Sequence, residues 1–83
     1  MVYIMKMRVN YGNSNITGKN ISEIRRQKGM KQKEMLAKLQ VSGVDISPSS
    51  LSELEGQTRI ATDKEIWEIA RILNVPIDML YKY

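Results

Sequence analysis

The chain has 83 residues, enough for one small domain, and 42% of them are hydrophobic, as is usual for a folded protein. It contains neither cysteine nor histidine, which excludes disulfides, an ordinary zinc site and catalysis by a thiolate or a histidine triad. The net charge of +4 is uneven: residues 1–40 carry nine basic and two acidic residues, whereas residues 41–83 carry four basic and seven acidic ones. A basic half suits a polyanion such as DNA, and it equally suits a solvated lysine-rich helix face.

No apolar run approaches the roughly 20 residues of a membrane span, and the first residues lack the charge order of a signal peptide. We therefore expect a cytoplasmic protein with no membrane partner. No enzyme, metal site or cofactor is expected either, because the Ser/Lys pairs that might carry chemistry fall on predicted exposed helix faces.

Residues 1–16 are predicted as an N-terminal arm that precedes a domain at 17–83. Apolar and polar side chains alternate from Tyr3 to Tyr11, which is the period of a β-strand, and residues 12–15 are typical of a turn. A single strand has no sheet to join in so small a chain. The arm could pair with its copy in a dimer, pack across the helices or remain loose, and the sequence favours none of these.

From Thr17 onward the apolar spacing is helical, with Thr17 predicted as the first N-cap and Gly29 as the end of the first helix. A second helix is predicted over about 32–40, followed by a connection of about seven residues. Ser47 and Pro48 then begin a third helix in the favoured order, an N-cap followed by proline at the first helical position.

Gly56 is predicted to end the third helix, and a capping box of Thr62 and Glu65 to begin the fourth. The fourth helix ends before Asn74, and residues 77–80 form a last short turn. The side chains expected in the core recur at helical spacing: Ile21, Met35, Leu36, Leu39, Leu51, Leu54, Ile66, Ile69 and Leu73. The fold class is therefore all-α, a compact bundle of five short helices.

The second and third predicted helices have the geometry that places a helix in the major groove of DNA. If Leu51 and Leu54 face the core, the polar side chains of the third helix face solvent and can approach base edges. These candidates are Ser49, Ser50, Ser52 and Glu53. Serine-rich helix starts are common, so the pattern alone is weak evidence for DNA binding.

The order of residues in the segments 21–37 (ISEIRRQKGMKQKEMLA) and 46–55 (ISPSSLSELE), continued by 63–80, resembles the lambda-repressor-like, Cro/repressor-type (xenobiotic-response-element) helix-turn-helix domain. The resemblance covers about 19–80 and rests on the spacing of the whole set. It implies a five-helix lambda-repressor-like bundle in a repressor-type transcriptional regulator. Such a regulator binds double-stranded DNA as a homodimer, with a reading helix at about 48–55 in the major groove of an inverted-repeat operator.

The resemblance also implies roles for single residues. Arg25 and Glu55 match an ion pair that links the first helix to the end of the third. Gln32 matches a residue that touches the DNA backbone and sometimes a base, although a solvated first-turn residue is the plainer interpretation. Phosphate contacts are expected from three basic side chains, Lys31, Lys33 and Arg59.

Four features depart from the family pattern. Lys31 stands where a Ser or Thr N-cap is usual, and the connection before the third helix is about five residues longer than in compact phage repressors. Pro48 cannot hydrogen-bond a base, and Glu53 is acidic where a basic or amide side chain is common. Since the third helix has no arginine for guanine, we expect weaker or more shape-dependent recognition of DNA than in a typical member.

Two alternatives remain open: an antitoxin-type regulator that also neutralises a partner toxin, and a protein-interaction module that has lost DNA binding. Pro48 and Glu53 favour the second of these. Trp67 is expected in the core or at an interface rather than stacked on bases. A dimer could use the N-terminal strand or the apolar residues of the last helices, Trp67, Ile77, Met79, Leu80 and Tyr81.

Overall fold

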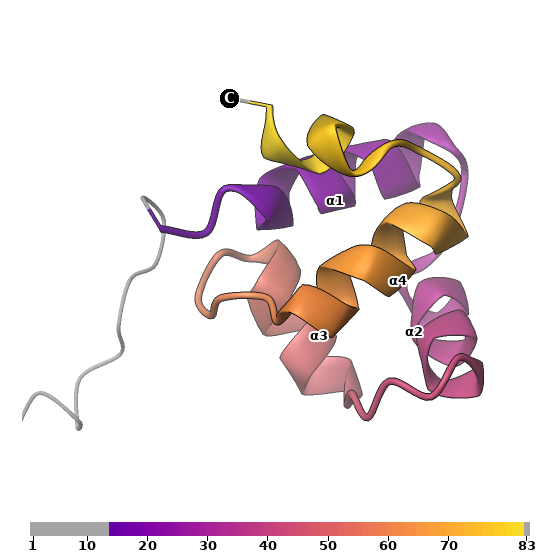
Figure 1. Cartoon of the computed structure of the whole chain (residues 1–83). Coiled ribbons are helices and arrows are strands. Elements are labelled where there is room, and N and C mark those ends of the chain that lie inside the picture. The colour runs from indigo at the N-terminus through magenta and orange to yellow at the C-terminus, as the bar shows by residue number, and fades with distance from the viewer. Residues whose placement is uncertain (1–13, 83) are drawn as a thin grey trace, which may run out of the picture.

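The computed structural model describes residues 14–82, which form four α-helices and one 3₁₀ helix. In chain order these are α1 (Thr17–Gln27), α2 (Gln32–Val41), α3 (Pro48–Glu55), α4 (Asp63–Leu73) and η2 (Ile77–Tyr81) (Figure 1). Residues 14–82 thus contain helices and no strands. The segment predicted as the last short helix is a 3₁₀ helix. The predicted strand at 3–11 lies outside the described residues.

The start of α1 corrects the predicted N-cap. Thr17 is buried inside the helix, and the cap is supplied by Asn15, whose Oδ1 accepts a hydrogen bond from the Gly18 backbone N–H at 2.7 Å. The Asn15 Nδ2 donates to the carbonyl of Leu54 at 3.1 Å. One side chain therefore caps α1 and joins it to the end of α3.

The predicted starts of α3 and α4 are confirmed. Ser47 accepts from the backbone N–H of Ser50 at 3.1 Å, and Pro48 occupies the first helical position. Thr62 accepts from the Glu65 N–H at 3.2 Å, and the Glu65 carboxylate accepts from the Thr62 N–H at 2.9 Å. Both signals lie within four residues, which is why sequence alone reveals them.

Each α-helix is followed within two residues by a residue with positive φ, in a paired set of backbone hydrogen bonds that satisfies the last carbonyls. Gly29 (φ +70°) and Gly43 (φ +97°) do this after α1 and α2. After α3, Gly56 keeps a negative φ, and the next residue, Gln57 (φ +64°), adopts the left-handed conformation. The helix therefore ends next to Gly56, as predicted, but Gln57 rather than the glycine adopts the left-handed conformation.

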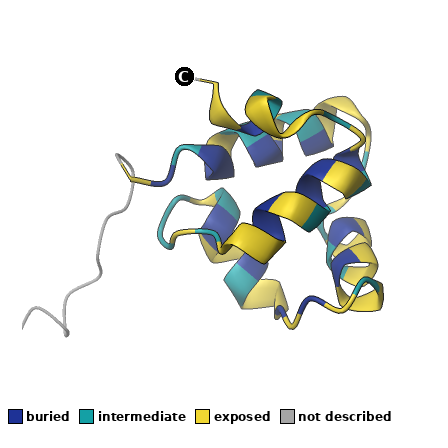
Figure 2. Cartoon of the chain, in the orientation of Figure 1, coloured by how far each residue is buried: buried dark blue, intermediate teal, exposed yellow. Residues whose placement is uncertain are grey.

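The core contains buried side chains from every helix (Figure 2): Ile21, Met35, Leu39, Leu51, Leu54, Ile66, Ile69, Ala70, Leu73 and Leu80. Leu36, predicted as core, is only partly buried. The long connection between α2 and α3 adds Val44 and Ile46, both buried, and the Gln40 Nε2 donates to the carbonyl of Ile46 at 3.1 Å. This connection is therefore packed into the fold.

In the bundle, α1 packs against α3 and η2, and α2 packs against α3 and α4. Figure 1 shows α4 on the near side of the bundle and α3 on the far side. The molecule thus presents two distinct faces, one built on α3 and one on α4. Among residues 14–82 no helix is long and apolar enough to cross a membrane.

Candidate nucleic-acid interface

The Gln32 side chain joins the start of α2 to α3. Its Oε1 accepts from the Ser52 hydroxyl at 3.2 Å, and its Nε2 donates to the Glu55 Oε1 at 3.2 Å. Gln32 is half-buried, and each end of an amide has capacity for one further hydrogen bond. The residue predicted to touch DNA therefore bridges α2 and α3 and can still reach a ligand.

Arg25 and Glu55 form a bidentate pair between α1 and the last residue of α3. The Arg25 Nε and Nη2 donate to the two Glu55 carboxylate oxygens, each at 2.9 Å, and Nη1 donates to the carbonyl of Met30 at 2.8 Å. The two side chains are 10% and 6% exposed. The pair holds the C-terminal end of α3 against α1.

The Arg59 side chain, predicted to bind a phosphate, makes several contacts within the protein. Its Nη1 and Nη2 donate to the two carboxylate oxygens of Glu65, each at 2.9 Å, and its Nε donates to the carbonyl of Ser50 at 2.9 Å. Nη1 also donates to the carbonyl of Ile60. Since most donors of the guanidinium bind protein acceptors, Arg59 serves to hold the first half of α3.

Glu65 can take part in this pair because its carboxylate has more acceptor positions than the α4 cap uses. Burial raises the pKa of the Glu65 carboxyl, but hydrogen bonds from Arg59 and the Thr62 backbone and the positive charge of Arg59 outweigh burial. The pKa of Glu65 is therefore below 4.5, and the carboxylate is charged at neutral pH.

The exposed surface beside Gln32 carries two lysines. The Lys31 backbone N–H donates to the Glu34 carboxylate at 2.9 Å, but the Lys31 side chain makes no capping bond, because an ammonium cannot accept one. Both Lys31 and Lys33 are exposed, and no described carboxylate lies within 4.0 Å of either ammonium. Both cations are thus available for phosphate.

The outer side of α3 is polar and short-chained. Ser49, Ser52 and Glu53 are exposed, Ser50 is half-buried, and the hydroxyls of Ser49 and Ser47 lie 3.3 Å apart. Within residues 14–82 no cluster of acidic side chains is arranged to hold a metal ion. The surface offers hydroxyls, one carboxylate, an amide and two ammonium groups, which suits a polar polyanion.

A short polar helix braced across a second short helix, with free lysines beside it, defines the helix-turn-helix class of DNA-binding domain. A family model described as helix-turn-helix matches residues 21–80, and the chain belongs to this family, of the Cro/C1 type. The comparisons with curated proteins and with solved structures found no match. The chain is thus a helix-turn-helix DNA-binding domain, and its family is not one of enzymes.

Proposed function

We propose that this domain is a sequence-specific transcriptional repressor, which binds an inverted-repeat operator as a homodimer with α3 in the major groove. The observation that carries the proposal is the surface at the starts of α2 and α3, where Gln32 bridges the helices beside the unpaired Lys31 and Lys33. The major groove, about 12 Å wide, admits one helix of this kind.

In this arrangement the two lysines neutralise phosphates beside the groove, and Gln32 reaches the backbone or the first base. The α3 side chains then meet base edges, and Glu53 can accept from the amino group of cytosine. All of these side chains except Glu53 are short hydroxyls: Ser49, Ser50 and Ser52. Because α3 has no arginine, we expect a large share of the specificity to come from DNA shape.

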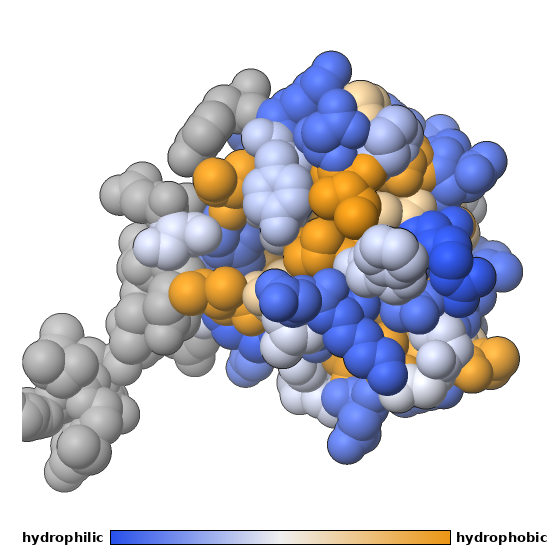
Figure 3. All heavy atoms as spheres, in the orientation of Figure 1, coloured by the Kyte–Doolittle hydropathy of each residue, from blue (hydrophilic) through white to orange (hydrophobic). Residues whose placement is uncertain are grey.

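The face built on α4 and η2 supports assembly with a protein. Trp67, expected in the core or at an interface, is 62% exposed, so packing in the core is wrong. Ile77 and Tyr81 are also exposed, and Figure 3 shows hydrophobic side chains gathered on this face between hydrophilic ones. A two-fold operator requires two α3 helices about 34 Å apart that face the same DNA, so a homodimer would meet at the edge of this face or through residues 1–16.

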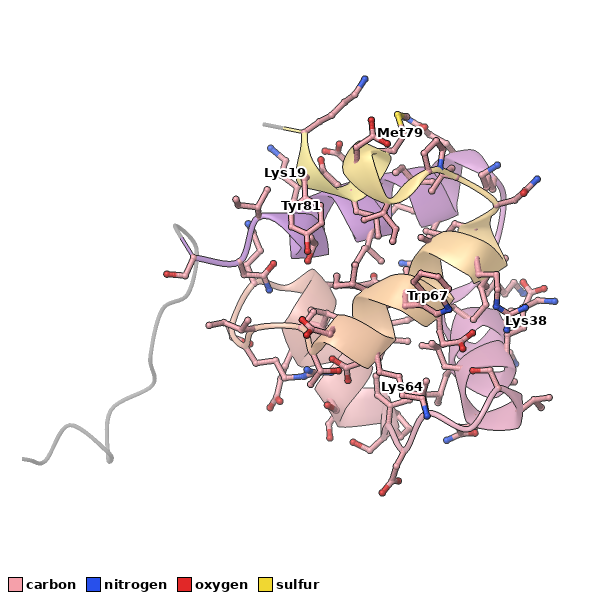
Figure 4. The ribbon with its side chains drawn as sticks, viewed as in Figure 1. Lys19, Lys38, Lys64, Trp67, Met79 and Tyr81 are labelled. Atoms are coloured by element: carbon pink, nitrogen blue, oxygen red, sulfur yellow. The ribbon has the colours of Figure 1, made fainter. Side chains whose placement is uncertain are left out.

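The test of DNA binding is fluorescence anisotropy with random-sequence duplex DNA at two salt concentrations. The wild-type chain should bind more weakly at high salt, and Lys31→Ala with Lys33→Ala should reduce the salt slope by roughly two. The matched control is Lys38→Ala with Lys64→Ala, which removes the same charge from the face of Trp67 (Figure 4). Absence of binding at low salt would eliminate the repressor and leave the protein-interaction module.

The exposed Trp67 also favours a second candidate, an antitoxin-type regulator that uses this face for a partner protein. Sedimentation at several concentrations separates the two. A wild-type dimer that Trp67→Ala dissociates supports the homodimer. A wild-type chain that stays monomeric and binds DNA contradicts the homodimer and favours a different protein partner.

A further inference from the structure

A small hollow lies between the starts of α2 and α3, on the surface that carries Gln32 and Lys33. Its volume is about 140 Å³, and it is lined by Gln32, Lys33, Leu36, Pro48 and Leu51. Leu36 is half-buried, Pro48 is exposed and Leu51 is fully buried. The hollow is thus lined by apolar side chains, from the exposed Pro48 to the buried Leu51, and it has a polar edge.

The size and chemistry of the hollow restrict what can enter it. Pockets for cofactors and drug-sized ligands measure about 300–1,000 Å³, so this hollow admits a group of only a few atoms. Polar groups of base edges would lose hydrogen bonds to water against Leu36 and Pro48. The one apolar group that the major-groove edge of ordinary DNA offers is the C5 methyl of thymine.

Gln32, at the edge of the hollow, has a compatible preference. An amide side chain pairs with adenine through N6 and N7, and adenine is the partner of thymine. Hydrogen bonds to Ser52 and Glu55 hold the Gln32 amide beside the hollow. An apolar hollow and an amide that both favour A·T pairs therefore lie side by side.

We propose that Leu36 and Pro48, at the hollow that the buried Leu51 closes off from the core side, form a site for the C5 methyl of a pyrimidine, so that the domain selects thymine at one position of its DNA site. This inference rests on the proposed function. It assigns a role to Pro48, which cannot hydrogen-bond a base but supplies one wall of the hollow. The same methyl occurs on 5-methylcytosine, so the experiment separates the two sources.

The probe is the best duplex selected from a randomised library, in which each thymine is replaced in turn by deoxyuridine. This replacement removes one methyl and nothing else. At one position the affinity should fall about fourfold, the value of one buried methyl-sized group. At that position a C·G pair with 5-methylcytosine should bind more tightly than the same pair with unmodified cytosine.

Two variants assign the effect to the hollow. Pro48→Ala and Leu36→Ala each remove a wall and should bring the ratio of thymine to uracil affinities close to one, with the salt slope unchanged. Val41→Ala is the matched control, because Val41 is 89% exposed at the opposite end of α2. Circular dichroism of each variant confirms that the helices form.

The outcomes are distinguishable. Equal affinity for thymine and uracil at every position of a bound duplex would overturn the methyl site and leave the repressor in place. Full discrimination in both Pro48→Ala and Leu36→Ala would also overturn it, because the methyl would be bound elsewhere. A chain that binds no DNA would remove the proposed function and this inference with it.

Discussion

Two arginine–glutamate pairs hold α3 at its two ends, and they are built differently. Arg25 and Glu55 are 30 residues apart, link α1 to the end of α3, and are 10% and 6% exposed. Arg59 and Glu65 are six residues apart, more exposed at 21% and 9%, and reach α3 only through the carbonyl of Ser50. One end of α3 is thus fixed by a tertiary ion pair and the other by a local one.

The difference bears on the proposal that α3, a helix with short side chains, reads DNA. Serines extend little beyond the backbone, so their distance from a base edge depends on where the whole helix lies. The two pairs, together with Gln32, fix that position before DNA arrives. We therefore expect changes at either pair to affect stability first and DNA affinity second.

The largest effect is expected at the buried pair. Glu55→Ala leaves the Arg25 guanidinium buried without a charge partner and removes one acceptor of Gln32, so the free energy of unfolding should fall by about 3–5 kcal/mol. Urea denaturation measures it. The double variant Arg25→Ala, Glu55→Ala should lose less than the sum of the two single losses. A loss of under about 1 kcal/mol would mean that the pair behaves as an exposed one.

The same end of α3 depends on a close approach of backbones. A Cβ on Gly18 would lie 2.1 Å from the carbonyl oxygen of Leu54, so Gly18→Ala should force α1 and α3 apart and cost about 1–3 kcal/mol or more. Gly29→Ala is the control, because nothing lies within 4 Å of its added Cβ. Its free energy of unfolding should fall by about 1 kcal/mol, from the positive φ alone. Equal losses would contradict tight packing at Gly18.

The local pair should matter less. Arg59→Ala leaves the Glu65 carboxylate with its Thr62 hydrogen bond and partial access to water, so we expect a loss of about 1–3 kcal/mol, below that of Glu55→Ala. Affinity for DNA should fall with the salt slope unchanged, because Arg59 positions α3. A slope that falls by roughly one would instead show that Arg59 binds a phosphate.

The pH dependence of stability tests the pair of Arg59 and Glu65. The folded pKa of Glu65 is lowered from 4.5, so its contribution is fully present above pH 4.5 and is lost as the pH falls through the folded pKa. Thermal unfolding between pH 6 and pH 3 should therefore show a smaller acid loss in Glu65→Gln than in the wild-type chain. Parallel curves for the two proteins would contradict the assignment.

The smallest effect is expected at the start of α2. Lys31→Ser supplies the missing cap and should raise the free energy of unfolding by about 1 kcal/mol. The same change should weaken DNA binding and reduce the salt slope by roughly one. A more stable variant with unchanged DNA binding would show that Lys31 lies away from the phosphates.

Local signals made most of the fold predictable. Ser47 with Pro48, and Thr62 with Glu65, mark helix starts within four residues, and the apolar spacing identifies most of the core. It misses Val44 and Ile46 in the connection. The sequence misplaced what depends on distant partners. Asn15 caps α1 while bound to Leu54, and nothing near Gly18 in the chain indicates that a carbonyl of α3 lies beside it.

The candidate site was predictable to a lesser degree. The outward serines of α3 follow from helix periodicity, and the two lysines and the pair of Arg25 and Glu55 follow from the family resemblance. Arg59 was expected at a phosphate because it is a basic residue that follows α3. Nothing in the sequence indicates that its side chain pairs with Glu65. Glu65 had already been assigned to the α4 cap, and only the structure shows that one carboxylate serves both roles.

The most direct test of DNA binding by α3 is an NMR titration of the labelled chain with the selected duplex. Trp67 is the single tryptophan, so its indole N–H reports on the α4 face alone. The expected result is that the backbone amide shifts change at Gln32, Lys33, Ser49 and Ser50. The indole chemical shift should not change, provided that DNA leaves the oligomeric state of the protein unaltered. Shifts centred on the Trp67 indole, with α3 unaffected, would contradict α3 as the reading helix.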